Sequence, residues 1–314
     1  MLNQCHIGDC RTLLRDFVTA GVRAQMCVTS PPYFGLRDYG HPGQIGLETA
    51  PADYIAQLVA VFAAVRDVLS DDGTVWLNLG DSYANDGKWG GHTGGKHVKA
   101  LHCSPIGRNK RYTGLKPKDL IGIPWRAAFA LQADGWYLRS DIIWHKPNPM
   151  PESIEDRPTK AHEYLFLLSK SERYFYDYEA SKELADPQYA GRYNYAFGGN
   201  KSEKMTAEEA QGAGSRTHPI GEREYDGKRN RRTVWTIPTA SFDGAHFATF
   251  PPALVEPCIM AGSRTGDVVL DPFMGSGTTA QVAEHLGRQW IGCELNADYV
   301  PLQQRRIAQR AMAL

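Results

Sequence analysis

The sequence predicts an α/β fold in which a mostly parallel sheet carries helices on both faces. Within residues 1–80, short apolar runs typical of buried strands alternate with segments of helical periodicity. Further on, a glycine turn joins an apolar run at 268–270 to a helical segment, an arrangement that can hold an anionic group at a helix N-terminus. With 42% hydrophobic and 22% charged residues, the chain has globular composition rather than that of a disordered or fibrous protein.

The expected elements follow in chain order. A strand ends near His6-Ile7, and we then expect a helix at 11–18, a strand at 26–28, a helix at 52–69 and a strand at 74–79. Asp71-Asp72-Gly73 predicts a turn before the last of these strands. The rest of the chain predicts a helix at 125–132, strands at 138–145 and 164–168, a helix at 251–260, a strand at 268–270, a helix at 278–286, a strand at 290–293 and a basic amphipathic helix at 299–312.

Composition excludes several classes of protein. The 314 residues can bury a core without disulfide or metal support. No apolar run approaches the roughly 18 residues of a membrane span, and the N-terminus lacks the basic and apolar regions of a secretory signal. The six cysteines are scattered without a Cys-x-x-Cys pair, which predicts a cytoplasmic location. We expect no metal, because the spacing of His92, His97, His102 and Cys103 fits no common zinc pattern.

Charge is balanced over the whole chain but not locally. Thirty-five basic residues meet thirty-five acidic ones, which alone argues against a polyanionic partner. Yet residues 87–118 contain no Asp or Glu and eight Lys or Arg, including Lys110 and Arg111. A second cluster comprises Lys228, Arg229, Arg231 and Arg232. A short cluster alone is most simply a solvated surface, but two clusters in Gly-rich segments predict contact with phosphates.

The glycine turn predicts a site for a nucleoside cofactor. It contains Asp271, Phe273, Gly275, Ser276, Gly277 and Thr278, and the next strand ends at Glu294. A P-loop would need a lysine that is absent, whereas residues 275–280 do match the dinucleotide pattern Gly-x-Gly-x-x-Ala. S-adenosylmethionine (SAM) is the third interpretation, with its carboxylate at the turn amides, its ribose at Glu294 and its sulfonium or adenine against Phe273. A purely structural turn is the fourth.

A second motif, Ser30-Pro31-Pro32-Tyr33, predicts a site for a flipped base. Proline has no N–H, so such a turn can present carbonyl oxygens that no neighbouring amide claims. An exocyclic amine could donate to the Pro31 carbonyl and the Ser30 hydroxyl while Tyr33 stacks on the ring. These acceptors would favour the localised lone pair that the amine needs for methyl transfer. On its own the motif would more simply be a plain Pro-Pro loop, and it gains its meaning from the glycine turn further along the chain.

Taken together, residues 29–33 and 271–279 resemble the catalytic and cofactor motifs of DNA amino-methyltransferases. The catalytic motif comes first, as in the circularly permuted beta group of that family. The resemblance covers nearly the whole chain and implies that Asp9 contacts the cofactor's adenine. It also implies that Phe250, within the segment 246–251, lines the methionine end of SAM. Residues 144–147 resemble the family's strand beside the flipped base.

The resemblance implies a Rossmann-like SAM-dependent methyltransferase fold with an inserted recognition region. The catalytic half would be 1–185 with a basic loop at 80–118, the target-recognition region 186–232, and the SAM-binding half 233–314. The expected reaction is methyl transfer to an exocyclic amine in double-stranded DNA. N4 of cytosine is favoured over N6 of adenine because Ser30 stands where adenine enzymes typically carry Asp or Asn. The alternatives are methylation of RNA or of a protein amide, or a DNA-binding module without activity. A cognate restriction endonuclease is a candidate partner, no membrane is expected, and the chain would be a monomer or homodimer.

Overall fold

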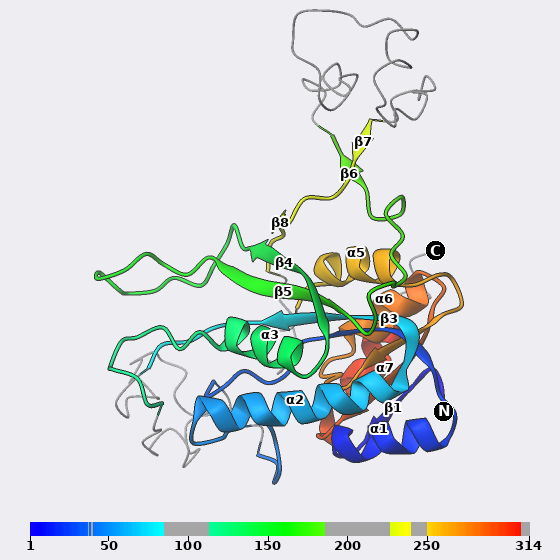
Figure 1. The fold of residues 1–314 in the computed structure, drawn as a ribbon, viewed down its shortest axis with the longest axis horizontal. Coiled ribbons are helices and arrows are strands. Elements are labelled where there is room, and N and C mark those ends of the chain that lie inside the picture. The colour runs from blue at the N-terminus through cyan, green and yellow to red at the C-terminus, as the bar shows by residue number, and fades with distance from the viewer. Residues whose placement is uncertain (37, 39, 85–112, 186–226, 240–249, 309–314) are drawn as a thin grey trace, which may run out of the picture. The chain divides into compact units, whose positions relative to one another are not determined.

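The structure is a computed structural model that describes residues 1–314 apart from 37, 39, 85–112, 186–226, 240–249 and 309–314 (Figure 1). The chain divides into two compact units. The larger unit contains Met1–Ala180 and Arg232–Leu314, and the smaller one contains Ser181–Arg231. No described helix is both long enough and apolar enough to cross a membrane.

The larger unit is built on an eight-stranded sheet among the described residues. Its strands are, in spatial order, β1 (Gln4–Ile7), β10 (Gln289–Glu294), β9 (Val268–Asp271), β2 (Ala24–Thr29), β3 (Leu69–Leu79), β5 (His162–Ser169), β4 (Tyr137–His145) and β8 (Val234–Thr236). The first five strands are parallel to one another, and β8 is parallel to β4. Only β5 runs against its two neighbours. The predicted α/β class with a mostly parallel sheet is confirmed.

Helices cover both faces of this sheet, as Figure 1 shows for α2 below it and α5 above it. One core lies beneath α1 (Cys10–Thr19), α2 (Pro51–Val68) and α3 (Ile123–Ala133). The opposite core lies beneath α5 (Pro252–Gly262) and α6 (Thr278–His285), with α7 (Val300–Ala308) beside it after the short 3-10 helix η3 (Ala297–Tyr299). Strand β2 is buried on both sides: Cys27 faces the first core, and Met26 and Val28 face the second. A strand covered on both faces has a continuous apolar sequence, which is why residues 26–28 predicted it.

The turn expected at Asp71-Asp72-Gly73 is wrong, because β3 continues through these residues. Ala24 pairs with Leu69 while Met26 pairs with Thr74, so β3 takes in extra residues between two register positions of β2. A Cβ on Gly73 would lie 2.9 Å from the Ser70 carbonyl oxygen and 3.1 Å from that of Gln25. The polar Asp-Asp-Gly segment is therefore an irregularity inside a strand, where backbones approach closely.

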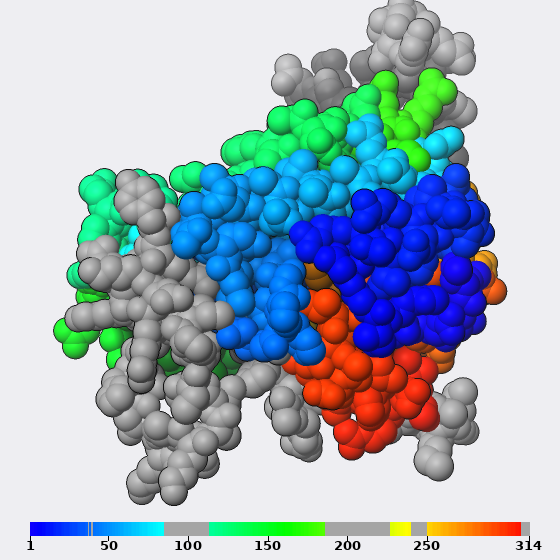
Figure 2. Space-filling model, turned by 90° about the horizontal axis from the view of Figure 1, so that it is seen from below, coloured from blue at the N-terminus to red at the C-terminus, as the bar shows by residue number. Residues whose placement is uncertain are grey.

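The two ends of the larger unit meet in one sheet. β1 pairs with β10, and β9 lies between β10 and β2. Figure 2 shows the same neighbourhood from below, with the N-terminal segment in blue beside the C-terminal segment in orange and red. Because β2 and β9 are parallel neighbours, the residues that follow them emerge at the same edge of the sheet. This edge brings the two sequence motifs together.

In the smaller unit, the described residues form a two-stranded antiparallel ladder. It pairs β6 (Glu183–Leu184) with β7 (Lys228–Arg229), and Glu183 lies opposite Arg229. The sequence did not predict these strands or β8, because two or three residues are too few to show an alternating pattern. The division into recognition region and halves at 185 and 232 stays a prediction.

Candidate active site

A buried carboxylate joins the two motifs. Asp271 ends β9 and is 0% exposed, and Thr29 ends the neighbouring strand β2. The Thr29 hydroxyl donates to Asp271 Oδ1 at 2.6 Å, and the Thr279 hydroxyl of α6 donates to Oδ2 at 2.6 Å. The Phe273 amide also donates to Oδ1, at 3.0 Å. Burial raises the pKa of Asp271, and the two threonine hydroxyls oppose that rise. Both oxygens are thus used inside the protein, so contact of Asp271 with a cofactor stays a prediction.

The glycine turn is held from outside by α7. Gln303 donates to the Gly275 carbonyl oxygen at 2.8 Å, and Arg306 donates to the Ser276 hydroxyl at 2.5 Å. Gly277 has φ 84°, in the left-handed region that favours glycine, and a Cβ there would lie 3.2 Å from Gln303. A larger residue at Gly277 would therefore disturb packing against α7 as well as any ligand. Neither contact was predicted from the sequence, although the basic character of the last helix was a signal for Arg306.

The turn offers donors and an acceptor suited to a nucleoside with a carboxylate. No side chain caps the N-terminus of α6, so the first amides after Gly277, starting at Thr278, are not claimed by a capping side chain. Glu294 accepts from the Gly275 amide at 2.7 Å and from the Asn296 amide at 2.9 Å, one on each oxygen. Burial raises the pKa of Glu294, while these amides lower it. An ionised carboxylate accepts about four hydrogen bonds, which leaves capacity for a ribose diol. The residues present therefore fit SAM.

Two further residues predicted to contact the cofactor lie on other elements. Asp9 follows β1, in which Ile7 lies opposite Glu294, so the sheet brings both acids to one edge. Its carboxylate accepts from the Arg11 amide at 2.8 Å and pairs with the Arg11 guanidinium at 2.5 Å. The hydrogen bond from Arg11 is the largest cause of a lowered pKa for Asp9. Phe250 packs against the core beneath α5. Residues 246–249, which precede it in the predicted motif, lie outside the described residues.

The two proline carbonyls of the Ser-Pro-Pro-Tyr turn differ in their hydrogen bonding. Tyr54 donates to the Pro32 carbonyl oxygen at 2.8 Å, whereas no described donor is hydrogen-bonded to the Pro31 carbonyl. Gly80 leaves room for Tyr33, because a Cβ there would lie 2.5 Å from Cε2 of the Tyr33 ring. The Pro31 oxygen therefore suits the acceptor role that the sequence predicts, and that role stays a prediction.

The Tyr33 hydroxyl reaches a polar cluster that sequence analysis missed. It donates to Glu163 Oε2 of β5 at 2.6 Å and lies 3.1 Å from Asn78 Oδ1 of β3. Lys146 forms an ion pair with the other oxygen of Glu163. Burial, and next the charge of Glu163, raise the pKa of Tyr33 well above its usual value. Glu163 was not predicted as a site residue, because the expected strand at 164–168 was identified from its apolar residues and began one position later.

The predicted DNA-contacting residues are only partly described. Lys110 and Arg111 lie outside the described residues, as do the four His and Cys residues considered for a metal. In β7, Arg229 pairs with Glu183 at 2.8 Å, and the nearby Arg231 donates to the Ser181 carbonyl at 2.9 Å. Lys228 is on the same strand, and in the larger unit the Arg232 carbonyl accepts from Trp235. Contact of these cations with phosphates stays a prediction.

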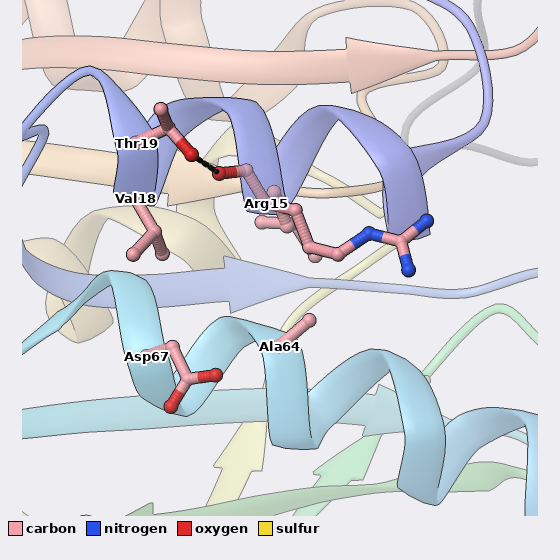
Figure 3. Close-up of a pocket in the computed structure, with 6 residues that line it drawn as sticks. Arg15, Val18, Thr19, Ala64 and Asp67 are labelled. Atoms are coloured by element: carbon pink, nitrogen blue, oxygen red, sulfur yellow. Dashed lines mark hydrogen bonds between the residues drawn. The ribbon is translucent and has the colours of Figure 1, made fainter.

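A pocket of 230 Å³ lies elsewhere, between α1 and α2. Figure 3 shows Arg15, Val18 and Thr19 of α1 across from Ala64 and Asp67 of α2, with Thr19 bonded to the Arg15 carbonyl. No residue of either motif lines it, so it is separate from the candidate active site.

A parallel sheet that joins a Pro-Pro-Tyr turn to a glycine turn suited to SAM defines the class of SAM-dependent methyltransferases. A family model described as DNA methylase matches residues 24–305, and the chain belongs to this family. It is a SAM-dependent DNA amino-methyltransferase.

Relatives and solved structures agree with this assignment. The chain is 48% identical over 300 residues to the Type II methyltransferase M.XycI of Xanthomonas campestris pv. cyanopsidis, covering 96% of this chain and 86% of the relative. It is 49% identical over 284 residues to M.SmaI of Serratia marcescens, covering 90% and 84%. The PvuII DNA methyltransferase (cytosine-N4-specific) shares the fold at 19% identity and a TM-score of 0.61, covering 96% and 85%. A putative DNA modification methylase of Thermus thermophilus, complexed with SAM, does so at 22% identity and 0.58, covering 99% and 95%.

Proposed function

We propose that this enzyme methylates N4 of cytosine in double-stranded DNA. The observation that carries the proposal is the acceptor pair of the catalytic turn, the Ser30 hydroxyl beside the Pro31 carbonyl that no described donor occupies. Ser30 is the acceptor that the family resemblance associates with cytosine rather than adenine. The reacting amine is not accessible for in-line attack within the base stack, so the target base must flip out of the helix.

The residues of the turn prepare the amine for reaction. Its two hydrogens would be accepted by Ser30 and Pro31, which localises the nitrogen lone pair as positive charge develops. Tyr33, whose ring is fixed by Gly80 behind it and by its hydroxyl contacts, would stack on the base. SAM, held by the glycine turn and Glu294, would supply a methyl group on a sulfonium to the amine nitrogen, with the sulfur of SAM as the leaving group, and the amine would then release one proton.

The other parts of the proposal concern partners. We place target recognition in 186–232 and phosphate contact in the two basic clusters. The named relatives are Type II methyltransferases, which supports a cognate restriction endonuclease as a partner. Action on cellular DNA also supports a cytoplasmic location. The order of the motifs along the chain supports the circularly permuted arrangement.

Nucleoside analysis tests the target base. Duplex DNA from a methylation-free host is incubated with the enzyme and SAM, digested to nucleosides and analysed by mass spectrometry. We expect N4-methylcytosine as the product. Finding only N6-methyladenine would overturn the assignment of the base. Duplex RNA and single-stranded RNA of the same sequence serve as competing substrates, and preferential methylation of RNA would overturn the assignment of the polymer.

A further inference from the structure

Two hydroxyl groups of the catalytic turn and one carboxylate of β5 form a hydrogen-bond chain. Ser30 Oγ donates to Tyr33 Oη at 3.4 Å, and Tyr33 Oη donates to Glu163 Oε2 at 2.6 Å. The side chains of Glu163 and Lys146 are only 14% and 18% exposed, so this end of the chain is largely shielded from water. The chain thus runs from the enclosed ion pair to the hydroxyl proposed to meet the target amine.

The direction of these hydrogen bonds follows from the chemistry of each group. An ionised carboxylate only accepts, and a tyrosine hydroxyl has a single hydrogen. Of the two acceptors near that hydrogen, Glu163 at 2.6 Å is closer than Asn78 at 3.1 Å. The Asn78 amide group donates to the same Glu163 oxygen at 3.2 Å and to the Tyr164 carbonyl at 3.1 Å, which fixes Glu163 further. The Tyr33 hydrogen therefore points to Glu163, and the Tyr33 oxygen is left to accept from Ser30.

We propose that Glu163 is a positioning residue that makes Ser30 a pure acceptor for the target amine. With the Tyr33 hydrogen committed to Glu163, the Ser30 hydrogen is directed to Tyr33, and both lone pairs of Ser30 are left to accept. In the opposite direction, Tyr33 would donate to Ser30, one lone pair would be consumed, and the Ser30 hydrogen could point at the amine. This inference rests on the proposed role of Ser30 and adds the group that orients it. Lys146 holds the far oxygen of Glu163 and so keeps the carboxylate in place.

The variant Glu163→Gln reverses this direction with little change in shape. Its amide nitrogen can donate to Tyr33, which frees the Tyr33 hydrogen to turn toward Ser30. We expect kcat for DNA methylation to fall roughly 10- to 100-fold, the range for loss of a hydrogen bond to a charged group, while KM for DNA and the Kd of SAM stay within about twofold. Glu152→Gln is the matched control. Glu152 is also a partly buried carboxylate paired with a cation, Arg157 at 2.8 Å, and it takes no part in the hydrogen-bond chain from Ser30 to Glu163. We expect Glu152→Gln to leave kcat unchanged.

A double-mutant cycle separates positioning from a general structural role. In a Tyr33→Phe background the chain is already broken, so adding Glu163→Gln should have little further effect on kcat. Multiplying effects would overturn the proposal, because Glu163 would then act by a route that does not pass through Tyr33. A second cycle, Ser30→Ala with Tyr33→Phe, tests the same chain with Glu163 intact and remains informative if Glu163→Gln folds poorly. Here too, non-additive effects on kcat support the hydrogen-bond chain from Ser30 to Glu163, and effects on kcat that multiply overturn it.

Failure of the positioning role of Glu163 can be distinguished from failure of the proposed function. If the parent enzyme makes N6-methyladenine, the cytosine assignment fails, but Ser30 can accept from either amine and the cycles still decide the role of Glu163. If the parent enzyme makes N4-methylcytosine and the effects multiply, the proposed function stands and the positioning role fails.

Discussion

Replacing Thr29 by Val should destabilise the fold, whereas the same replacement at Thr74 should not. Both threonines are buried in neighbouring strands, at 0% and 1% exposure. Thr29 donates to the carboxylate of Asp271 at 2.6 Å, but no hydrogen-bond partner is found among the described groups for the Thr74 hydroxyl. Valine keeps the shape and the β-branch and removes only the hydroxyl. The pair of variants therefore compares a satisfied with an unsatisfied buried hydroxyl.

The magnitudes follow from these environments. A hydrogen bond to a charged group contributes about 1.5–3 kcal/mol, so Thr29→Val should lower the free energy of unfolding by that amount. Removing an unsatisfied buried hydroxyl should leave stability unchanged or raise it by about 1 kcal/mol. Urea denaturation followed by circular dichroism measures both. Equal losses for the two variants, or a larger loss for Thr74→Val, would refute the reasoning.

The pH dependence of the Thr29→Val penalty is a further check. Burial raises the pKa of Asp271 in the folded state, so its ionised form is the costly one. This carboxyl group therefore stabilises the fold most below its ordinary pKa of 3.8, and that contribution is lost as the pH rises through the raised value. The Thr29 hydrogen bond opposes this loss, because it lowers the pKa of Asp271. The penalty of Thr29→Val should be smallest in acid and reach its full size above the raised pKa; a constant penalty would contradict this linkage.

Three other predictions concern ligands. Tyr33→Ala should depress methylation, because stacking of a base on an aromatic ring contributes about 1–3 kcal/mol, while isothermal calorimetry shows SAM affinity unchanged; full turnover on duplex DNA would contradict it. Neutralising Lys228, Arg229, Arg231 and Arg232 together should flatten the salt dependence of DNA binding by about one unit for each lost phosphate contact, and a slope identical to the parent would assign these charges to solvent. SAM affinity should fall with decreasing pH at a value above 4.5, since burial raises the pKa of Glu294 and a diol donates best to the ionised carboxylate; a titration with no inflection above 4.5 would remove Glu294 from the ribose site.

The sequence predicted the parallel core of the fold because both faces of its strands are covered. The runs at 26–28, 268–270 and 290–293 became β2, β9 and β10, whose residues are nearly all buried. It failed at Asp71-Asp72-Gly73, where a polar, turn-like composition lies inside β3. Local composition reports what a segment favours alone, but pairing with β2 decides the outcome there.

The two motifs could be predicted because each is a continuous stretch of sequence. The residues around them could not be predicted, because they come from other elements that only the folded chain brings close. Glu163 meets Tyr33 only because β3 and β5 are antiparallel neighbours that place Asn78 opposite Leu165 and Leu79 opposite Tyr164. The residues around Glu163 in the sequence do not predict that strand pairing. The same holds for Gln303 and Arg306, whose contacts with the glycine turn depend on how α7 packs beside α6.

The contact between the motifs does not depend on their order along the chain. Thr29 and Asp271 are 242 residues apart in sequence, yet they share a hydrogen bond because β2 and β9 are neighbours. The entropic cost of closing a loop rises by only about 0.6 kcal/mol for each doubling of its length, so a large separation adds little to the cost of this pairing. The site requires that both strands end at one edge of the sheet. There the Asp271 carboxylate accepts hydrogen bonds from Thr29 and from Thr279. A chain that supplies the catalytic strand first meets this requirement as well as one that supplies the cofactor strand first, so the permuted order proposed for this enzyme is physically allowed.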